Sequence, residues 1–341
     1  MKEMGVGIIG TGWVSDEYIR SFEKNPHTRV IALCSREKAK AQAKAAQHGL
    51  KNCAAVTRPE DLVKLPGLDI VCINTPNFLH ADQAILAAEN RKHIVIEKPV
   101  ATNWEDMKRM KDAVDKAGVT TIVGFVLRWN PLFLTIKKML ADGILGKVNY
   151  AEVDYFLGLT QDFSCYPWSV KKETAGSILQ VGGCHAVDGL RWFVDDEAVE
   201  VVALSSRFRP DFEQDTTITF IAKFKSGAMG KVCCSYDVAN PYIYGIELFG
   251  SKGTVINNRV WAKESFPGQE GWITIPTTPP DSVDVSHHPF PSEVDHFVEC
   301  IQAGRRTIVD LDDAIKTFEI IEAADRSASS SGTPVRLPLG R

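Results

Sequence analysis

The sequence lacks the features of membrane-spanning and nucleic-acid-binding proteins. No apolar stretch approaches the roughly 20 residues that a membrane-spanning helix needs, and basic runs are no longer than a pair such as Lys171–Lys172. The 39 basic residues are outnumbered by 43 acidic ones, which gives a net charge of −4. We therefore expect neither a membrane nor a nucleic-acid partner. The first residues also lack an apolar targeting segment, which predicts a cytoplasmic protein.

Paired cysteine motifs are missing as well. Eight cysteines are scattered without any C-x-x-C spacing, and several lie in apolar runs such as "IVCIN" and "KVCCS". The adjacent Cys233 and Cys234 would point to opposite faces of a strand. We therefore expect small core residues rather than disulfides or zinc ligands, and no metal site. The pair His287–His288 has no carboxylate or cysteine at ligand spacing and is predicted to lie in a polar loop.

The first part of the chain alternates strand and helix patterns. With 341 residues and 44% apolar content, the chain is long enough for two domains. The runs "VGIIG", "VIALC", "DIVCINT", "HIVIEKP" and "TTIVGFV" are separated by helical patterns. Continuous apolar strands between helices indicate a parallel sheet covered on both faces. Residues 1–123 are thus predicted to form an α/β, doubly wound Rossmann domain that binds a dinucleotide.

The pattern changes after Pro131. A helical segment is followed by longer runs with period-two character, including "KVNYAEVDYF", "TTITFIAKF" and "YGIELFG". Turn signals such as "KSGA" and "GSKG" indicate antiparallel pairing. We predict that residues 124–341 form an α+β substrate-binding and oligomerisation domain with a large open, mainly antiparallel sheet. Because the predicted helices are too few to cover both faces, we expect a homo-oligomer formed through this sheet.

A glycine-rich loop follows the first predicted strand. In "GIIGTGWVS", two glycines form a G-x-G-x-x-S pattern between a strand and a helix. Gly10 permits a tight turn, and Gly12 lets the backbone approach a pyrophosphate at the helix N-terminus. In this context the pattern predicts cofactor binding through Gly10, Thr11, Gly12, Trp13 and Val14.

The end of the second strand bears on the choice of dinucleotide. The sequence "LCSRE" places Ser35 and Arg36 where an acidic residue would bind the ribose 2′-hydroxyl of NAD(H). Arg36 can accept the 2′-phosphate of NADP(H), but it can equally stack on the adenine while Ser35 binds the ribose. The sequence leaves NAD(H) and NADP(H) open.

The next strand ends in "INTPNFLH". Asn74, Thr75, Pro76 and Asn77 are predicted to form a loop over the cofactor, in which the proline fixes the backbone and the polar side chains cap the next helix. His80 lies in the first turn of that helix. Two interpretations remain for it, a surface or capping residue and a residue that shapes the cofactor site.

The run "IVIEKPV", residues 94–100, ends a buried strand in two charged residues and a proline. Charged side chains are unfavourable to bury unless paired, so one interpretation is a strand that reaches the surface. The other is a functional Lys98 at the carboxyl end of a parallel strand, where open α/β sheets bind ligands. Pro99 makes an unusual backbone turn accessible, and Glu97 can hold the lysine. Beside an oxidised nicotinamide, such a lysine can accept a proton from a hydroxyl.

Several longer motifs resemble one family. The stretch "INTPNFLHADQAILAAENRKHIVIEKPVATN" is similar to the one that marks the glucose-fructose oxidoreductase, inositol dehydrogenase and rhizopine-catabolism (Gfo/Idh/MocA) family, and "GFVLRWNP" and "GSILQVGGCHAVDGLRWF" extend the similarity. The resemblance implies a pyridine-nucleotide domain, an open-sheet domain, and oxidation or reduction of a sugar or cyclitol hydroxyl. It implies that Lys98 reaches both nicotinamide and substrate, and that its bond to Pro99 is cis. It also implies that His185, which opens a predicted helix after a Gly-Gly turn, is the second catalytic residue, as proton relay or base.

One position departs from the family pattern. Many relatives carry an aspartate four residues before this histidine, where it binds substrate hydroxyls, whereas this chain has Val181. Gln180 would point elsewhere on a strand, and Asp188 is one turn downstream. We therefore expect Lys98 and His185 to form the catalytic core, with a substrate pocket that is less polar at Val181.

Two further segments are candidates for the site. The sequence "LRWNP" places Arg128 just after the last strand of the first domain, where the resemblance makes it a cofactor or substrate neighbour and a structural ion pair is the alternative. The segment "DFSCYPWSVKKE" offers Tyr166 and Trp168. Their flat apolar faces and polar tips can line a sugar pocket, or they can pack in the core.

Taken together, these features predict an NAD(P)-dependent dehydrogenase that oxidises, or reversibly reduces, a secondary hydroxyl of a pyranose sugar, glycoside or cyclitol. Analogy within the family points to sugar C3. Lys98 and His185 would manage the proton while the cofactor takes the hydride. One alternative is an NAD-dependent glycosidase that transiently oxidises C3 and eliminates the glycosidic substituent. Another is a non-catalytic cofactor sensor, and the retention of Lys98 and His185 argues against it.

Overall fold

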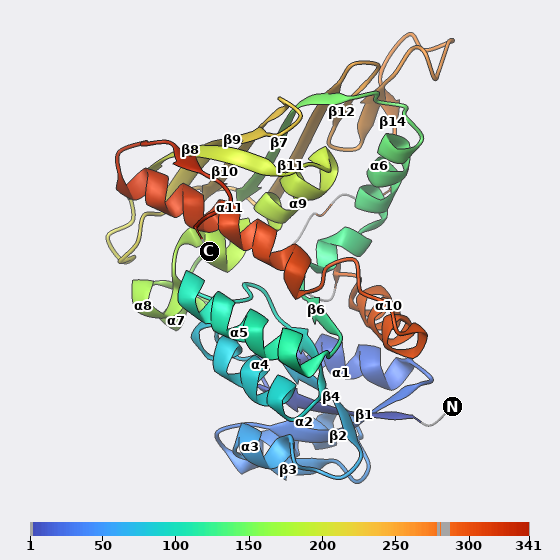
Figure 1. The fold of residues 1–341 in the computed structure, drawn as a ribbon, viewed down its shortest axis with the longest axis vertical. Helices are drawn as coiled ribbons and strands as arrows, with labels where there is room; N and C mark the ends of the chain where they lie inside the picture. Colours follow the sequence, from blue (N-terminus) through green and yellow to red (C-terminus); the bar gives the residue numbers. More distant parts are fainter. Residues whose placement is uncertain (1–2, 278–279, 281–286, 341) are drawn as a thin grey trace. The chain divides into compact units, whose positions relative to one another are not determined.

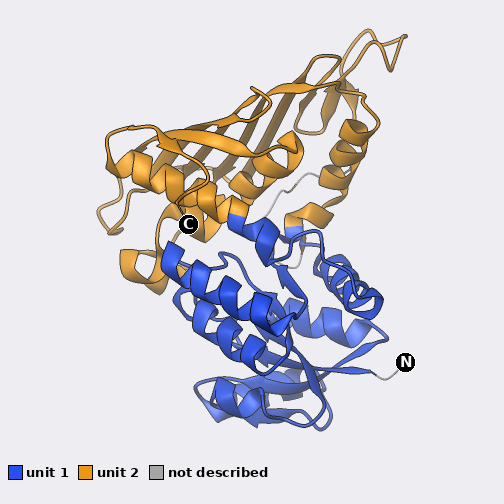
Figure 2. Ribbon diagram, viewed as in Figure 1, with its two compact units in different colours: residues 1–126, 288–315 blue, residues 127–287, 316–341 orange. Residues whose placement is uncertain are grey.

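The computed structural model describes residues 3–277, 280 and 287–340. The chain divides into two compact units (Figure 2). Unit 1 contains residues 1–126 and 288–315, and unit 2 contains residues 127–287 and 316–341. Unit 1 therefore receives a return segment from the C-terminal part of the chain, whereas the division predicted from the sequence, 1–123 and 124–341, has none.

Unit 1 is built on a parallel sheet with the strand order β3-β2-β1-β4-β5-β6. Every neighbouring pair of its strands runs parallel. The order reverses direction between β1 and β4, which is the arrangement of dinucleotide-binding α/β sheets. The strands are β1 (Met4–Ile9), β2 (Thr28–Cys34), β3 (Ala54–Val56), β4 (Leu68–Ile73), β5 (His93–Ile96) and β6 (Thr121–Val123).

Helices follow most of these strands (Figure 1). Because crossovers between parallel strands are right-handed and the order reverses at β1, helices α1 and α2 cover one face and α4 and α5 the other. Local signals set their ends: the Asn103 side chain accepts a hydrogen bond from the Asp106 N–H at the start of α5, and Gly118 ends that helix at φ 65°. The helices are α1 (Ser15–Lys24), α2 (Lys38–Gln47), α3 (Pro59–Leu62), η1 (Asn77–Leu79), α4 (His80–Glu89) and α5 (Trp104–Ala117).

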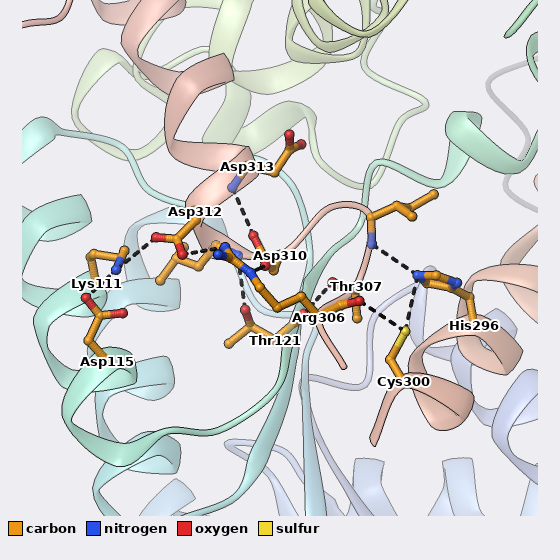
Figure 3. A network of polar contacts seen from close by, with 12 residues as sticks. Lys111, Asp115, Thr121, His296, Cys300, Arg306, Thr307, Asp310, Asp312 and Asp313 are labelled. Atoms are coloured by element: carbon orange, nitrogen blue, oxygen red, sulfur yellow. Dashed lines mark hydrogen bonds and ion pairs between the residues drawn. The ribbon is translucent and has the colours of Figure 1, made fainter. Parts of the chain in front are cut away.

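The return segment consists of α10 (Phe290–Ala303), a connection, and the first residues of α11 (Leu311–Ser329). The connection lies beside β6, where the Val123 N–H donates to the Val309 carbonyl at 3.0 Å and the Thr307 hydroxyl donates to the Thr121 carbonyl at 2.7 Å. An ionic network fixes the start of α11, in which Asp312 binds Lys111 of α5 at 2.8 Å and also Arg306 (Figure 3). These contacts make the segment an integral part of unit 1.

Unit 2 is built on a larger open sheet with the order β14-β13-β12-β11-β7-β10-β9-β8-β15. Only β7 and β10 pair in parallel among the described strands of this sheet, and the other pairs are antiparallel. The strands are β7 (Val148–Phe156), β8 (Ala198–Ser206), β9 (Thr217–Phe224), β10 (Met229–Ser235), β11 (Ile243–Gly250), β12 (Thr254–Ile256), β13 (Arg259–Trp261), β14 (Ile273–Thr274) and β15 (Val335–Arg336). The predicted fold class is confirmed.

Burial alternates along the strands of unit 2, as expected for a sheet with one covered face. Ala151, Val153 and Tyr155 of β7 are buried, whereas the residues between them are more exposed. Helix α9 packs on the buried face against β7 and β10. The helices of this unit are η2 (Val126–Trp129), which begins at the boundary, α6 (Pro131–Ala141), α7 (Tyr166–Ser169), α8 (Lys172–Ala175), η3 (Leu179–Gly183), α9 (Cys184–Val194) and most of α11.

The segment before His185 differs from the prediction. Leu179–Gly183 form a π-helix that continues directly into α9, so Gln180 does not lie on a strand and the two glycines do not form a turn. The glycines are needed for close packing: a Cβ on Gly182 would lie 2.7 Å from the Tyr236 hydroxyl, and one on Gly183 would lie 2.8 Å from Cys234 Sγ. Single-turn π-helices of this kind occur frequently at functional sites.

Within the described residues, no helix has the length and apolar character needed to cross a membrane. The cytoplasmic localisation stays a prediction. The cysteines are free, and Cys34, Cys72, Cys184, Cys234 and Cys300 are buried, as expected for small core residues.

Candidate active site

The glycine loop lies between β1 and α1, at the carboxyl end of the parallel strands. Gly10 has a φ of 98°, and a Cβ on it would lie 2.5 Å from the Asn74 carbonyl oxygen. Both its conformation and the close approach of the next loop therefore require glycine. Gly12 differs, because a Cβ there would meet no described atom within 4 Å. The protein leaves open space in front of Gly12, which is where a bound pyrophosphate would lie.

Trp13, the residue after Gly12, is accessible, whereas Ser15 is buried. The side chain of Trp13 is 43% exposed, and Ser15 donates a hydrogen bond to the Gly12 carbonyl at 2.5 Å. Next to this loop, Ser35 follows β2 and donates its N–H to the Val56 carbonyl at 3.1 Å, while Arg36 is exposed. The structure therefore places Arg36 in solvent at the end of β2, where either a ribose or a 2′-phosphate can reach it.

The loop after β4 is tied to the glycine loop and to α4. The Asn74 N–H donates to the Ile9 carbonyl at 2.8 Å, and the Thr75 hydroxyl donates to Gln83 Oε1 at 2.7 Å. Asn77 is buried at the start of η1, after Pro76. The predicted cofactor loop is therefore rigidly placed at the carboxyl edge of the sheet.

His80 is fully buried, so it is not a surface residue. Its Nε2 lies 2.8 Å from the Thr75 carbonyl and its Nδ1 lies 2.8 Å from the Pro99 carbonyl. Burial lowers the pKa of His80, the two carbonyl oxygens oppose this shift, and the charge of Lys98 adds to it. The imidazole therefore links the loop after β4 to the loop after β5.

The Glu97–Lys98–Pro99 turn follows β5 directly. The Lys98–Pro99 peptide is cis, as the family resemblance implies. Glu97 is buried, and its two oxygens accept hydrogen bonds from the Tyr18 hydroxyl at 3.0 Å and from the Lys98 N–H at 3.1 Å. Burial raises the pKa of Glu97, and the charge of Lys98 and the two hydrogen bonds offset only part of this rise. Lys98 itself is half-buried, so the charged end of this strand is only partly exposed.

In unit 2, His185 lies in the first turn of α9 and is 7% exposed. Its carbonyl accepts a hydrogen bond from the Tyr244 hydroxyl of β11 at 2.7 Å. Tyr155 approaches the same segment, since a Cβ on Gly182 would lie 2.8 Å from its ring. These contacts with β11 and β7 therefore fix the backbone around His185.

Arg128 forms a buried bidentate ion pair with Asp188. Its Nε and Nη2 atoms donate to the two carboxylate oxygens at 2.8 and 2.6 Å, and the Thr317 hydroxyl donates to the same carboxylate at 3.0 Å. The Arg128 guanidinium also lies 5.7 Å from the centre of the Trp192 ring. The structure therefore shows the ion-pair alternative for Arg128, and a contact with cofactor stays a prediction. Both carboxylate oxygens of Asp188 accept hydrogen bonds from Arg128. Asp188 is therefore not placed to act for the family aspartate, whose position is occupied by Val181 in this chain.

The remaining substrate candidates are less buried. Val181 lies half-buried in the π-helix, and the neighbouring Gln180 accepts a hydrogen bond from the Ser177 N–H at 3.2 Å. Tyr166 and Trp168 are half-buried in α7, and the Tyr166 hydroxyl donates to Asp211. Their role as walls of a substrate pocket stays a prediction.

Sequence reasoning missed two residues that contact or face Glu97. Tyr18 of α1 and Glu293 of α10 are both fully buried. Helical spacing carries a signal for the second, since Glu293 lies three residues after Phe290 and four before Phe297, on the same buried face. An acidic residue on an apolar helix face is unusual and points to a functional or paired carboxyl.

Comparison with known proteins places the chain in a family. Residues 4–125 match the model of the oxidoreductase family with an NAD-binding Rossmann fold, and residues 133–256 match the GFO/IDH/MocA C-terminal domain. The chain therefore belongs to the Gfo/Idh/MocA oxidoreductase family. The predicted class of enzyme, an NAD(P)-dependent oxidoreductase, and its cofactor class are confirmed.

The sequence identity between this chain and individual relatives is low. The chain is 28% identical to scyllo-inositol 2-dehydrogenase (NAD(+)) of Bacillus subtilis (strain 168), over 98% of this chain and 96% of that protein. It is 28% identical to levoglucosan dehydrogenase of Pseudarthrobacter phenanthrenivorans, over 76% of this chain and 74% of that protein. The crystal structure of aldose-aldose oxidoreductase from Caulobacter crescentus, complexed with glycerol, superimposes with a TM-score of 0.82 at 27% identity and covers 98% of this chain and 100% of that one.

The two glycines of the loop provide a matched pair for testing cofactor binding. Gly12→Val is expected to change the unfolding temperature by less than about 2 °C, because the added side chain meets open space. It should weaken NAD(P)H binding at least about 100-fold, because the isopropyl group fills the position of the pyrophosphate. Gly10→Val, in contrast, is expected to destabilise the fold itself, since its φ is 98°. Calorimetry measures the unfolding temperature and nicotinamide fluorescence measures the cofactor affinity. Unaltered cofactor affinity in Gly12→Val would contradict the placement of the pyrophosphate at Gly12.

Proposed function

We propose that this protein is an NAD(P)-dependent dehydrogenase that oxidises, or reversibly reduces, a secondary hydroxyl of a pyranose sugar, glycoside or cyclitol. The observation that carries the proposal is Lys98, held half-buried at the carboxyl end of β5 beside a buried Glu97. It stands on the edge of the sheet that carries the glycine loop. The relatives named for inositol and levoglucosan dehydrogenation support this substrate class.

The cofactor fits the residues of unit 1. Gly12 leaves open space at the start of α1, and Gly10 and Asn74 bring two loops together beside it. When bound there, the nicotinamide supplies hydride transfer. The chain's own residues would bind and orient it: the loop at Gly10–Val14 would hold the pyrophosphate, Ser35 and Arg36 the adenosine ribose, and residues 74–77 the nicotinamide end.

The proton is handled by Lys98 and His185 in this proposal. Lys98 accepts the proton of the reacting hydroxyl, and Glu97 balances the charge that results. In this proposal the imidazole of His185 contacts the same substrate hydroxyl and acts as proton relay or second base. Val181 contributes an apolar contact where relatives have a carboxylate, and Tyr166 and Trp168 provide flat walls for the sugar ring. Within a pyranose, we propose C3 as the reacting carbon, from the family resemblance alone.

The test is a panel of cyclitols, aldoses and glycosides offered to the purified protein with NAD⁺ and with NADP⁺ in parallel. The formation of reduced nicotinamide is measured by absorbance, and the product is identified by NMR. The proposal expects turnover of at least one polyol and a ketone at one ring carbon. Turnover of a glycoside without added cofactor, with solvent hydrogen incorporated at C2, would favour the glycosidase instead. Failure of every polyol and keto sugar with both cofactors would count against a dehydrogenase.

We also propose that the protein is a homo-oligomer that covers the outer face of the unit 2 sheet. Large apolar side chains are exposed there on β8, β9, β10 and β11, with β7 between the last two: Leu204 (65%), Ile221 (51%), Met229 (50%) and Ile243 (46%). Lys231, Glu152 and Asp154 form ion pairs on the same face. Exposed apolar patches on sheets are typical of interfaces. Ile221→Glu is expected to lower the mass in multi-angle light scattering to that of a monomer, 37.6 kDa; a monomeric native protein would contradict the proposal.

A further inference from the structure

A second buried carboxyl group faces Glu97 from α10. Glu293 is fully buried, and α10 packs against α1, which carries Tyr18. The Tyr18 hydroxyl has one proton, which it donates to Glu97 at 3.0 Å. Glu293 faces the same hydroxyl, and neither of its oxygens accepts a hydrogen bond from the described residues. The cluster therefore holds two carboxyl groups and one phenol, which we call the Glu97–Tyr18–Glu293 cluster.

Within the part of the chain that the structure describes, few other charged groups reach this cluster. From β4, the buried thiol of Cys72 faces both carboxyl groups. From the turn after β5, the N–H and the charge of Lys98 act on Glu97. After β6, Gly124 packs closely on this cluster, since a Cβ on it would lie 2.9 Å from Glu97 Oε1. On α10 itself, the neighbouring Asp295 accepts a hydrogen bond from Asn25 at 2.7 Å.

Two carboxyl groups in one dry site do not both ionise. Glu97 has the better support for a negative charge, because it accepts hydrogen bonds from Tyr18 and from the Lys98 N–H. Burial raises the pKa of Glu293 well above its usual range, the negative charge of Glu97 raises it further, and the Tyr18 hydroxyl offsets only part of this rise. The favoured state has Glu97 ionised and Glu293 carrying the proton.

We propose that Glu293 is a protonated, neutral acid in the working enzyme and that it and Tyr18 are positioning residues, which keep a single negative charge on Glu97 beside Lys98. This inference rests on the proposed role of Lys98 as proton acceptor. A neutral Glu293 fills the space behind Glu97 without repelling its charge, and Tyr18 fixes the carboxylate in place. Loss of the Glu293 proton at high pH would put two negative charges behind Lys98 and disturb this geometry.

The first test reads the proton directly and needs no substrate. Infrared spectra of the whole protein at neutral pH are expected to show the carbonyl stretch of a protonated carboxylic acid. Glu293→Gln should lose the component of that band that comes from Glu293, whereas the component from Asp325, whose pKa burial raises to about 7, should stay. The control is Glu299→Gln, an exposed glutamate on the same helix, which should keep it. A spectrum of Glu293→Gln identical to that of the native protein would overturn the assignment, even if the enzyme turns over polyols.

The second test uses the pH dependence of stability. In the folded protein the pKa of Glu293 is raised from 4.5, so the folded state binds this proton more tightly than the unfolded chain does. The stabilisation from this group is complete below about pH 4.5 and is lost as pH rises towards the raised pKa. Glu293→Gln lacks this loss. Its unfolding temperature relative to the native protein should rise by about 2–4 °C for each pH unit crossed above pH 4.5; a constant difference would overturn the proposal.

The third test reads catalysis. Tyr18→Phe keeps the ring and removes only the hydroxyl, and it should lower kcat about tenfold with little change in KM. The native enzyme should lose activity at alkaline pH as Glu293 ionises, and in Glu293→Gln this loss should be absent. A superimposable pH profile of kcat/KM for Glu293→Gln and native enzyme would contradict the positioning role. If the infrared band of Glu293 were present but no substrate were turned over, the assignment of Glu293 as a protonated acid would stand and the proposed dehydrogenase activity would be overturned.

Discussion

Replacement of Lys98 by methionine is expected to lower kcat about 1,000-fold, the range in which a positioned general base contributes. Methionine has a similar length and apolar stem but cannot accept a proton. The fold should persist, because Glu97 is bound by the N–H of Lys98, which the variant keeps. Single-turnover measurement of nicotinamide reduction tests the chemical step, and thermal unfolding tests the fold.

A matched control separates this effect from the general loss of a positive charge. Lys108→Met removes a lysine from the exposed face of α5, where it pairs with Glu105, and should leave kcat within about twofold of native. If Lys98→Met turned over substrate at the native rate, the proton would have another acceptor. If the biological role survived without turnover by either protein, the cofactor-sensor alternative would be preferred.

Replacement of Asp188 by asparagine is expected to lower the free energy of unfolding by about 3–5 kcal/mol, the range for breaking a buried ion pair. The guanidinium of Arg128 is 2% exposed and loses a bidentate carboxylate. The Thr317 hydroxyl also loses a charged acceptor. Since this cluster joins η2, α9 and α11, the loss should lower the unfolding midpoint in urea.

Asp195→Asn is the control for this second variant. Asp195 follows α9 and pairs with Lys137 at 3.2 Å, but its side chain is 82% exposed. Exposed pairs contribute about 0–1 kcal/mol, and asparagine tolerates the left-handed conformation at this position, φ 56°. Equal midpoints for Asp188→Asn and Asp195→Asn would contradict a stabilising role for the buried pair.

Much of the fold is predictable from the sequence because it follows from local pattern. The apolar runs at β1, β4 and β5 lie between amphipathic segments, and their continuous hydrophobicity requires cover on both faces. The period-two runs of unit 2 predict its antiparallel sheet for the same reason. The positions of short elements cannot be predicted in this way. The three residues of β3 and the four of α3 are too few to show a period.

Other features depend on contacts between distant segments. The return of residues 288–315 to unit 1 rests on backbone hydrogen bonds such as Val123 to Val309, which no local pattern encodes. The π-helix at 179–183 depends on the close packing of Gly182 and Gly183, which in sequence resemble a turn. The sequence leaves a structural ion pair open for Arg128 as one of two alternatives, but no local pattern identifies its partner, Asp188, 60 residues away.

The candidate site shows the same division. The glycine loop, the loop at 74–77 and the Glu97–Lys98–Pro99 turn are contiguous motifs whose positions after successive parallel strands bring them to one edge of the sheet. Glu293 reaches the same place from almost 200 residues away, through the packing of α10 on α1. Only the three-dimensional structure reveals that Glu97 has a second carboxyl group behind it.

The proposed mechanism requires that Lys98 and His185 act on one hydroxyl oxygen. A crystal structure of the protein with oxidised cofactor and a substrate polyol tests it most directly. We expect Lys98 Nζ and one ring nitrogen of His185 both to lie within hydrogen-bond distance of the same oxygen, on the carbon that faces the nicotinamide. A complex in which these two side chains contact different ends of the sugar, or in which His185 faces away from it, would contradict the claim.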